Sequence, residues 1–134
     1  MCPHTTTTFP RPVMDIEVKL EPTLRAPSEA RRFVARELEA LGYPQLVDDA
    51  RLMVSELVTN SIAYAPGKPL WVDIRRAGKY LVLQVWDCSP QPPVARDPDL
   101  MAEGGRGLHV VDELGVRFGH DTFCCGKVAW VMLG

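Results

Sequence analysis

The segment that most constrains the fold is an apolar helical run from Gln45 to Ala65, which begins after Pro44 and ends at Pro66. At about 100° per residue, one face of a helix over this run is apolar. The face comprises Leu46, Ala50, Met53, Val54, Leu57, Val58 and Ile62. Asn60 lies at the edge of this apolar face. Glu56 lies just beyond the edge, one helical turn before Asn60. Both polar side chains therefore border the surface against which the helix packs.

Composition indicates one soluble globular domain. The chain has 134 residues, 46% hydrophobic and 24% charged, which is enough to bury a core without disulfides. The net charge is -2, whereas nucleic-acid-binding domains usually carry a basic surface patch. No direct contact with nucleic acid is therefore expected. No apolar run approaches a membrane span of about 20 residues and no secretory signal is present, which favours the cytoplasm and no membrane contact. The four cysteines lack zinc-site spacing and are expected to be free thiols.

The first half of the chain predicts a strand and two helices. Residues 1–13 are rich in Pro and Thr and predict a flexible arm, followed by a single domain over 14–134. Residues 15–21 alternate between apolar and charged side chains, as in an edge or outer strand. Ser28 to Gly42 has a Ser start and a Gly stop, which are typical of a helix. The helix from 45 to 65 follows.

The second half predicts four strands, a long loop and a short helix. Residues 70–75 and 80–87 flank a short turn, which indicates an antiparallel hairpin whose second strand ends on Asp87. A proline-rich loop follows, and long loops in compact domains are often lids or binding loops. A short helix over 108–114 and two strands, 116–120 and 127–133, joined by a turn through 121–126, complete the chain.

Three features of this order could carry chemistry. Gly104, Gly105 and Gly107 precede a helix, where free backbone N–H groups favour a phosphate, and the Arg106 guanidinium matches phosphate oxygens. Asp87 could accept a hydrogen bond from an exocyclic amine such as that of adenine. At a phosphate, the Asn60 carboxamide oxygen could coordinate Mg²⁺ and the Glu56 carboxylate could take a proton from an attacking hydroxyl. Each feature also has a plain interpretation, as a helix margin, a strand end or a turn.

Taken together, the order resembles the GHKL ATPase superfamily, and specifically the short bacterial anti-sigma factor serine/threonine kinases. The resemblance rests on Glu56-x-x-x-Asn60, the strand-terminal Asp87, Gly104-Gly105-Arg106-Gly107-Leu108 and the closing Gly126-Lys127-Val128-Ala129-Trp130 strand. It covers roughly residues 15–133. It implies an α/β (α+β) fold, the two-layer Bergerat sandwich, whose mixed, mainly antiparallel sheet is covered on one face by helices.

The resemblance also implies roles for individual residues. ATP with Mg²⁺ would be the cofactor, Glu56 the general base, Asn60 the Mg²⁺ ligand and Asp87 the acceptor for the adenine amine. The phosphates would lie against Gly105, Arg106, Gly107 and Leu108, and the loop from Cys88 to Glu103 would be the lid. The superfamily's usual D-x-G-x-G motif is here Asp87-Cys88-Ser89-Pro90-Gln91, which has neither glycine.

Three functions remain open on the sequence. The first is a serine/threonine kinase that phosphorylates an anti-sigma factor antagonist and also sequesters a sigma factor, acting as a homodimer as related kinases often do. The second is a non-catalytic module of the same fold that senses nucleotide or binds a partner, which the missing glycines favour. The third is an α/β domain in which the Glu/Asn pair and the glycines are structural.

Overall fold

The computed structural model describes residues 16–89, 117–123 and 126–134. Its elements in chain order are β1 (Glu17–Leu20), α1 (Ala26–Leu41), the 3-10 helix η2 (Pro44–Leu46), α2 (Val47–Tyr64), β2 (Leu70–Ala77), β3 (Tyr80–Asp87), β4 (Phe118–Phe123) and β5 (Gly126–Leu133). The predicted arm over 1–13, most of the predicted lid, the glycine-rich segment and the short helix over 108–114 lie outside the described residues.

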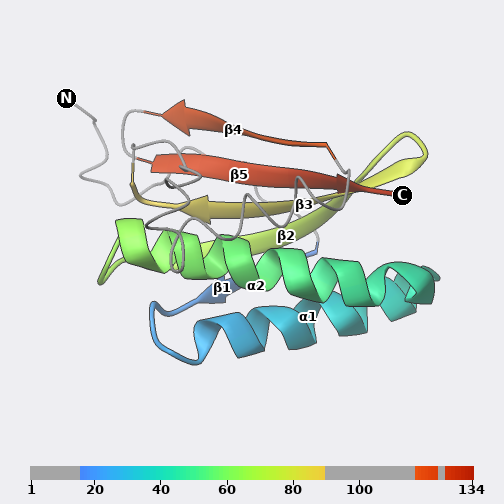
Figure 1. The fold of residues 1–134 in the computed structure, drawn as a ribbon, viewed down its shortest axis with the longest axis horizontal. Coiled ribbons are helices and arrows are strands. Elements are labelled where there is room, and N and C mark those ends of the chain that lie inside the picture. The colour runs from blue at the N-terminus through green and yellow to red at the C-terminus, as the bar shows by residue number, and fades with distance from the viewer. Residues whose placement is uncertain (1–15, 90–116, 124–125) are drawn as a thin grey trace, which may run out of the picture.

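The strands form one five-stranded sheet in the order β1-β2-β3-β5-β4. Every strand pair in the described residues is antiparallel. Both α1 and α2 lie on the same face of this sheet (Figure 1). The predicted α+β two-layer fold is therefore confirmed, and β1 is an edge strand as its alternating pattern predicted.

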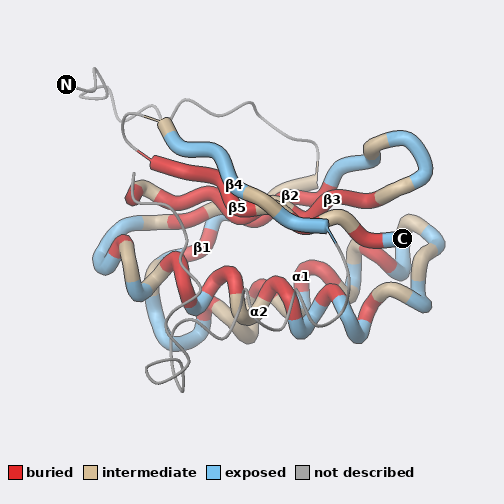
Figure 2. Tube along the Cα trace, turned by 45° about the horizontal axis from the view of Figure 1, so that its top comes forward, coloured by how far each residue is buried: buried red, intermediate tan, exposed pale blue. Residues whose placement is uncertain are grey.

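The core fills the space between the helices and the sheet, where buried segments of both layers face each other (Figure 2). Alternate residues of a strand point to opposite faces, so Leu81, Leu83 and Val85 face the helices from β3. The α2 face predicted from its periodicity meets them through buried residues such as Val54 and Val58. Burial of these apolar side chains holds the two layers together at about 25 cal/mol per Å² of surface removed from water.

Several element boundaries differ from the sequence prediction by a few residues, and two of these differences have a clear physical reason. Helix α1 begins at Ala26 rather than after Ser28, with Arg25 as its N-cap and Pro27 in the first turn, where the missing proline N–H costs nothing. The predicted turn through 121–126 is too long, because β4 continues to Phe123 and β5 begins at Gly126. Asp121 and Thr122 belonged to the predicted turn but lie in β4, because an exposed edge strand tolerates polar residues.

No helix within the described parts of the chain has the length and apolar character needed to cross a membrane.

Gly119 in β4 lies opposite Trp130 in β5. A Cβ atom at this position would come within 2.8 Å of Trp130 Cε2, which real side chains do not tolerate. We expect Gly119→Ala to lower the free energy of unfolding by about 1–3 kcal/mol, the usual cost of forcing extra volume into a packed site. Urea denaturation measures the change, with Thr122→Ala on the same strand as the control. A loss no greater than that of the control would mean that the indole moves aside freely.

Candidate functional site

Asn60 is buried near the end of α2, and none of the described residues forms a hydrogen bond with its side chain. Its side chain is only 4% exposed, and neither Oδ1 nor Nδ2 meets a partner in the part of the chain that the structure describes. A buried polar group left unpaired costs about 1–3 kcal/mol, and a carboxamide carries both donors and an acceptor. The sequence placed Asn60 at the margin of the apolar face; the structure places it inside. Its carboxamide is therefore available to a group from outside the described residues.

Asp87 is also buried, and its carboxylate is held from two sides. Its Oδ2 accepts a hydrogen bond from Lys127 Nζ at 2.7 Å, and both side chains are 3% exposed or less. Its Oδ1 accepts the backbone N–H of Ser89 at 2.9 Å. Asp87 and Lys127 lie opposite each other in the β3–β5 register, so the sheet itself sets the pair. An ionised carboxylate offers about four acceptor positions, and these two bonds leave room for a further donor.

The Asn60 and Asp87 positions lie at the same end of the molecule. In Figure 1 the C-terminal end of α2, the end of β3 and the start of β5 lie at one end of the fold. Asp87 shares a face of β3 with Leu83 and Val85, which pack against α2 in the core. The two buried polar side chains therefore both belong to the layer between helix and sheet.

Glu56 lies one turn before Asn60 on α2 and is half-buried. No hydrogen bond or ion pair joins its carboxylate to any residue within the described ranges. A carboxylate without a structural partner, next to a buried carboxamide, is free to accept a proton or a hydrogen bond from a bound molecule.

The phosphate-binding part of the prediction is not tested by the structure. Gly105, Arg106, Gly107 and Leu108 lie outside the described residues, as does the lid from Pro90 onward. Ser89, which stands where the superfamily usually has a glycine, is buried and holds Asp87 through its N–H. Its backbone is thus already part of the site.

Lys127 is the site residue for which the sequence predicted no role. The signal was a lysine directly before the apolar run Val128 to Leu133, since lysine is almost never fully buried unless it is paired. The partner could not be identified, because Asp87 is 40 residues away and strand register across that distance is not readable from periodicity. A buried ammonium bonded to the strand-terminal aspartate makes Lys127 part of the same site.

These observations define a class of protein: an α+β domain with a buried carboxamide and a buried carboxylate at one end of its helix–sheet interface, both suited to a polar ligand. The family model described as a histidine kinase-like ATPase domain matches residues 20–117, and the chain belongs to this family. No curated protein matches the chain significantly.

Domains of this family bind ATP, usually with Mg²⁺, and the described residues suit such a ligand. The Asn60 carboxamide oxygen is the hard donor that Mg²⁺ prefers, and its lack of a partner leaves it available. Asp87 supplies a buried acceptor of the kind that an exocyclic amine needs. The chain thus carries a nucleotide-binding domain of the histidine kinase-like ATPase type.

Proposed function

We propose that the protein is an ATP-dependent serine/threonine kinase of the cytoplasm that phosphorylates an anti-sigma factor antagonist and also sequesters a sigma factor. The observation that supports this most is the buried, unpartnered carboxamide of Asn60 one helical turn from a free Glu56 carboxylate. A helix that serves only for packing gains nothing from a buried, unpaired carboxamide, because this group lowers the stability of the fold.

The reaction proposed for these residues is the transfer of one phosphoryl group from ATP to a hydroxyl group of the partner. When bound, Mg-ATP would supply the γ-phosphoryl group. Glu56 would take the proton from a serine or threonine hydroxyl of the partner as its oxygen bonds to the γ-phosphorus and the bond to the bridging oxygen of ADP breaks. Asn60 would hold Mg²⁺ against the phosphates, and Asp87 would fix the base by accepting its amine. The glycine-rich segment with Arg106 would bind the phosphate oxygens.

Glu56→Gln tests the general-base role. The variant should bind Mg-ATP nearly as well as the wild type, because the amide keeps the size of the side chain, while phosphate transfer should slow by about 100-fold, since a positioned base contributes at least that much. The measurement is incubation with labelled ATP and candidate antagonist proteins, with binding followed separately by calorimetry. Unchanged transfer to a cognate partner would refute the role.

A second function is favoured by one specific feature, the absence of glycine after Asp87. Ser89 is buried and its N–H is committed to Asp87, so this backbone is less free to bend around a nucleotide than a glycine would be. The alternative is a nucleotide-sensing module that binds a regulatory partner without transferring phosphate to it. Binding of Mg-ATP in calorimetry, combined with no transfer to any antagonist tested, would favour this alternative over the kinase.

A further inference from the structure

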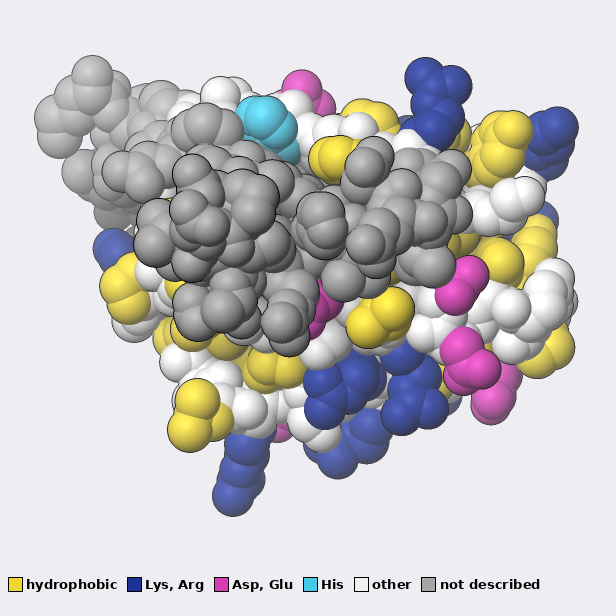
Figure 3. Space-filling model, in the orientation of Figure 1, with side chains coloured by type: hydrophobic (Ala, Val, Ile, Leu, Met, Phe, Trp, Pro, Cys, Tyr) yellow, Lys and Arg dark blue, Asp and Glu magenta, His cyan; other side chains and the backbone are white. Residues whose placement is uncertain are grey.

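The outer surface of the helix layer carries a groove in which four of the six lining residues are arginine. Its lining residues are Arg31, Arg32, Ala35, Arg36, Glu39 and Arg51, and its volume is about 440 Å³. In Figure 3, Lys and Arg side chains gather over the two helices. The chain as a whole carries a net charge of -2, so this concentration of positive charge is local. We term this surface the arginine groove.

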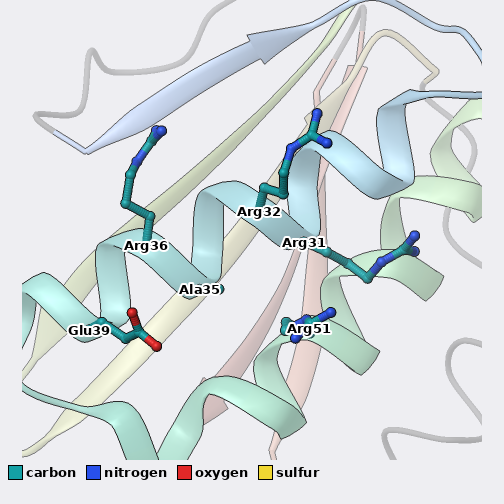
Figure 4. A pocket seen from close by; sticks show the side chains of 6 residues that line it. All are labelled: Arg31, Arg32, Ala35, Arg36, Glu39 and Arg51. Atoms are coloured by element: carbon teal, nitrogen blue, oxygen red, sulfur yellow. The ribbon is translucent and has the colours of Figure 1, made fainter.

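Helix geometry explains how the groove arises. Residues four apart lie next to each other on a helix surface, so Arg31, Ala35 and Glu39 form one row along α1 while Arg32 and Arg36 form the next. Ala35 has the smallest side chain of the five and leaves a hollow between the charged ones. Arg51 comes from α2, and in Figure 4 it lies near Arg31, while Arg32 and Arg36 point together in another direction.

Most of the guanidinium groups in the arginine groove lack a carboxylate partner. Arg31 Nη1 donates to Ser55 Oγ at 2.7 Å, a neutral bond that fixes the side chain and leaves its charge uncompensated. Arg36 pairs loosely with Glu37 at 3.4 Å, with the arginine 73% exposed. Arg32 and Arg51 make no ion pair or hydrogen bond within the described residues. The guanidinium groups of the groove can therefore bind anionic groups of another molecule.

The positions of the guanidinium groups distinguish between two kinds of anionic ligand, a single phosphate and a peptide with several carboxylates. A single phosphate is bound by donors that converge on one point, whereas the guanidinium groups in Figure 4 point in different directions. Arg32 and Arg36 are four residues apart on α1, about 6.0 Å along the helix axis. In an extended peptide, alternate side chains on one face are about 6.6 Å apart, which is a close match. Carboxylates at alternate positions of an extended segment fit this spacing.

We propose that the arginine groove is a docking surface for an extended acidic segment of a partner protein, with aspartate or glutamate at alternate positions. Glu39, at one end of the groove, repels a carboxylate there and sets the register of the segment. The site is separate from Asn60 and Asp87, which are buried between helices and sheet, so the inference does not depend on nucleotide binding.

The test uses the full chain and a fluorescently labelled short peptide with aspartate at alternate positions, compared with the same peptide carrying asparagine. Fluorescence anisotropy should show binding of the aspartate peptide alone, weakening as salt is raised. Arg32→Gln, Arg36→Gln and Arg51→Gln should each weaken binding by about two- to five-fold and together by roughly tenfold or more. Glu39→Gln should strengthen it. Arg75→Gln removes an equally exposed arginine of β2 and should change nothing.

Three results of the binding assay would overturn the proposal. The first is equal binding of the two peptides, and the second is equal loss with Arg75→Gln, either of which would mean that no specific surface exists. The third is displacement of the peptide by inorganic phosphate at low millimolar concentration, which would assign the groove to a small anion instead. Sedimentation of the same variants adds a control, because a change in self-association without a change in peptide binding would make a second copy of the chain the occupant and refute an acidic partner.

Discussion

Replacing Lys127 by methionine should lower the free energy of unfolding by about 3–5 kcal/mol. Lys127 Nζ lies 2.7 Å from Asp87 Oδ2, and both side chains are almost completely buried. Removing one partner of such a pair leaves a buried charge without compensation, which is the strongly destabilising case. The effect should exceed that of removing an exposed lysine, such as Lys19→Met on β1, by several-fold, as measured by urea denaturation.

A double-variant cycle separates the structural role of this pair from its role in binding. Asp87→Leu combined with Lys127→Met replaces both charges by apolar groups, which is often neutral or stabilising compared with the intact pair. We expect the double variant to regain most of the stability lost by Lys127→Met while failing to bind nucleotide, because it lacks the carboxylate that we propose as the acceptor for the base amine. A loss below about 1 kcal/mol for Lys127→Met, the range of exposed ion pairs, would contradict the buried pair.

Asn60→Leu should make the nucleotide-free protein more stable by about 1 kcal/mol while weakening Mg-ATP binding by about 10- to 100-fold. The gain arises because leucine has a similar shape and removes the desolvation cost of two unpaired polar atoms. The loss arises because Mg²⁺ and the phosphates lose a ligand, and bonds to charged groups contribute about 1.5–3 kcal/mol each. Opposite signs for stability and binding are the mark of a residue retained for function.

Gln84→Met is the matched control for Asn60→Leu. Gln84 Oε1 is likewise buried without a hydrogen-bond partner in the described residues, but it lies on the opposite face of β3 from Leu83 and Val85. Its replacement should also leave stability equal or higher, yet nucleotide binding should stay unchanged. A loss of stability with Asn60→Leu would mean that the carboxamide is structurally engaged, and undiminished binding would remove it from the site.

The helices and strands could be predicted because they follow from local patterns, whereas their two-layer arrangement was predicted from the resemblance to the GHKL ATPase superfamily. The apolar face of α2, the alternation of β1 and the short connection between β2 and β3 are each readable from a few consecutive residues. The start of α1 was misplaced because Ser28 looked like an N-cap, while Pro27 sits inside the first turn. Boundary errors of this kind reflect competing local signals rather than a wrong fold.

The site was predictable in part, for a different physical reason. Glu56 and Asn60 share one helix, so their spacing alone puts them on neighbouring positions. The depth of Asn60 was underestimated because burial depends on how the helix is rotated against the sheet, which the helix sequence does not contain. Lys127 was missed because its partner is set by the β3–β5 register, a long-range property. The roles predicted for Gly105, Arg106, Gly107 and Leu108 remain predictions.

The most direct test of the central claim, that a nucleotide binds where Asn60 and Asp87 lie, is isothermal titration calorimetry of the wild-type protein with Mg-ATP, with Asn60→Leu as its pair. We predict one-to-one binding to the wild type and binding that is at least tenfold weaker to the variant under the same conditions. An absence of heat from the wild type at millimolar Mg-ATP, or equal binding by the two proteins, would contradict this claim.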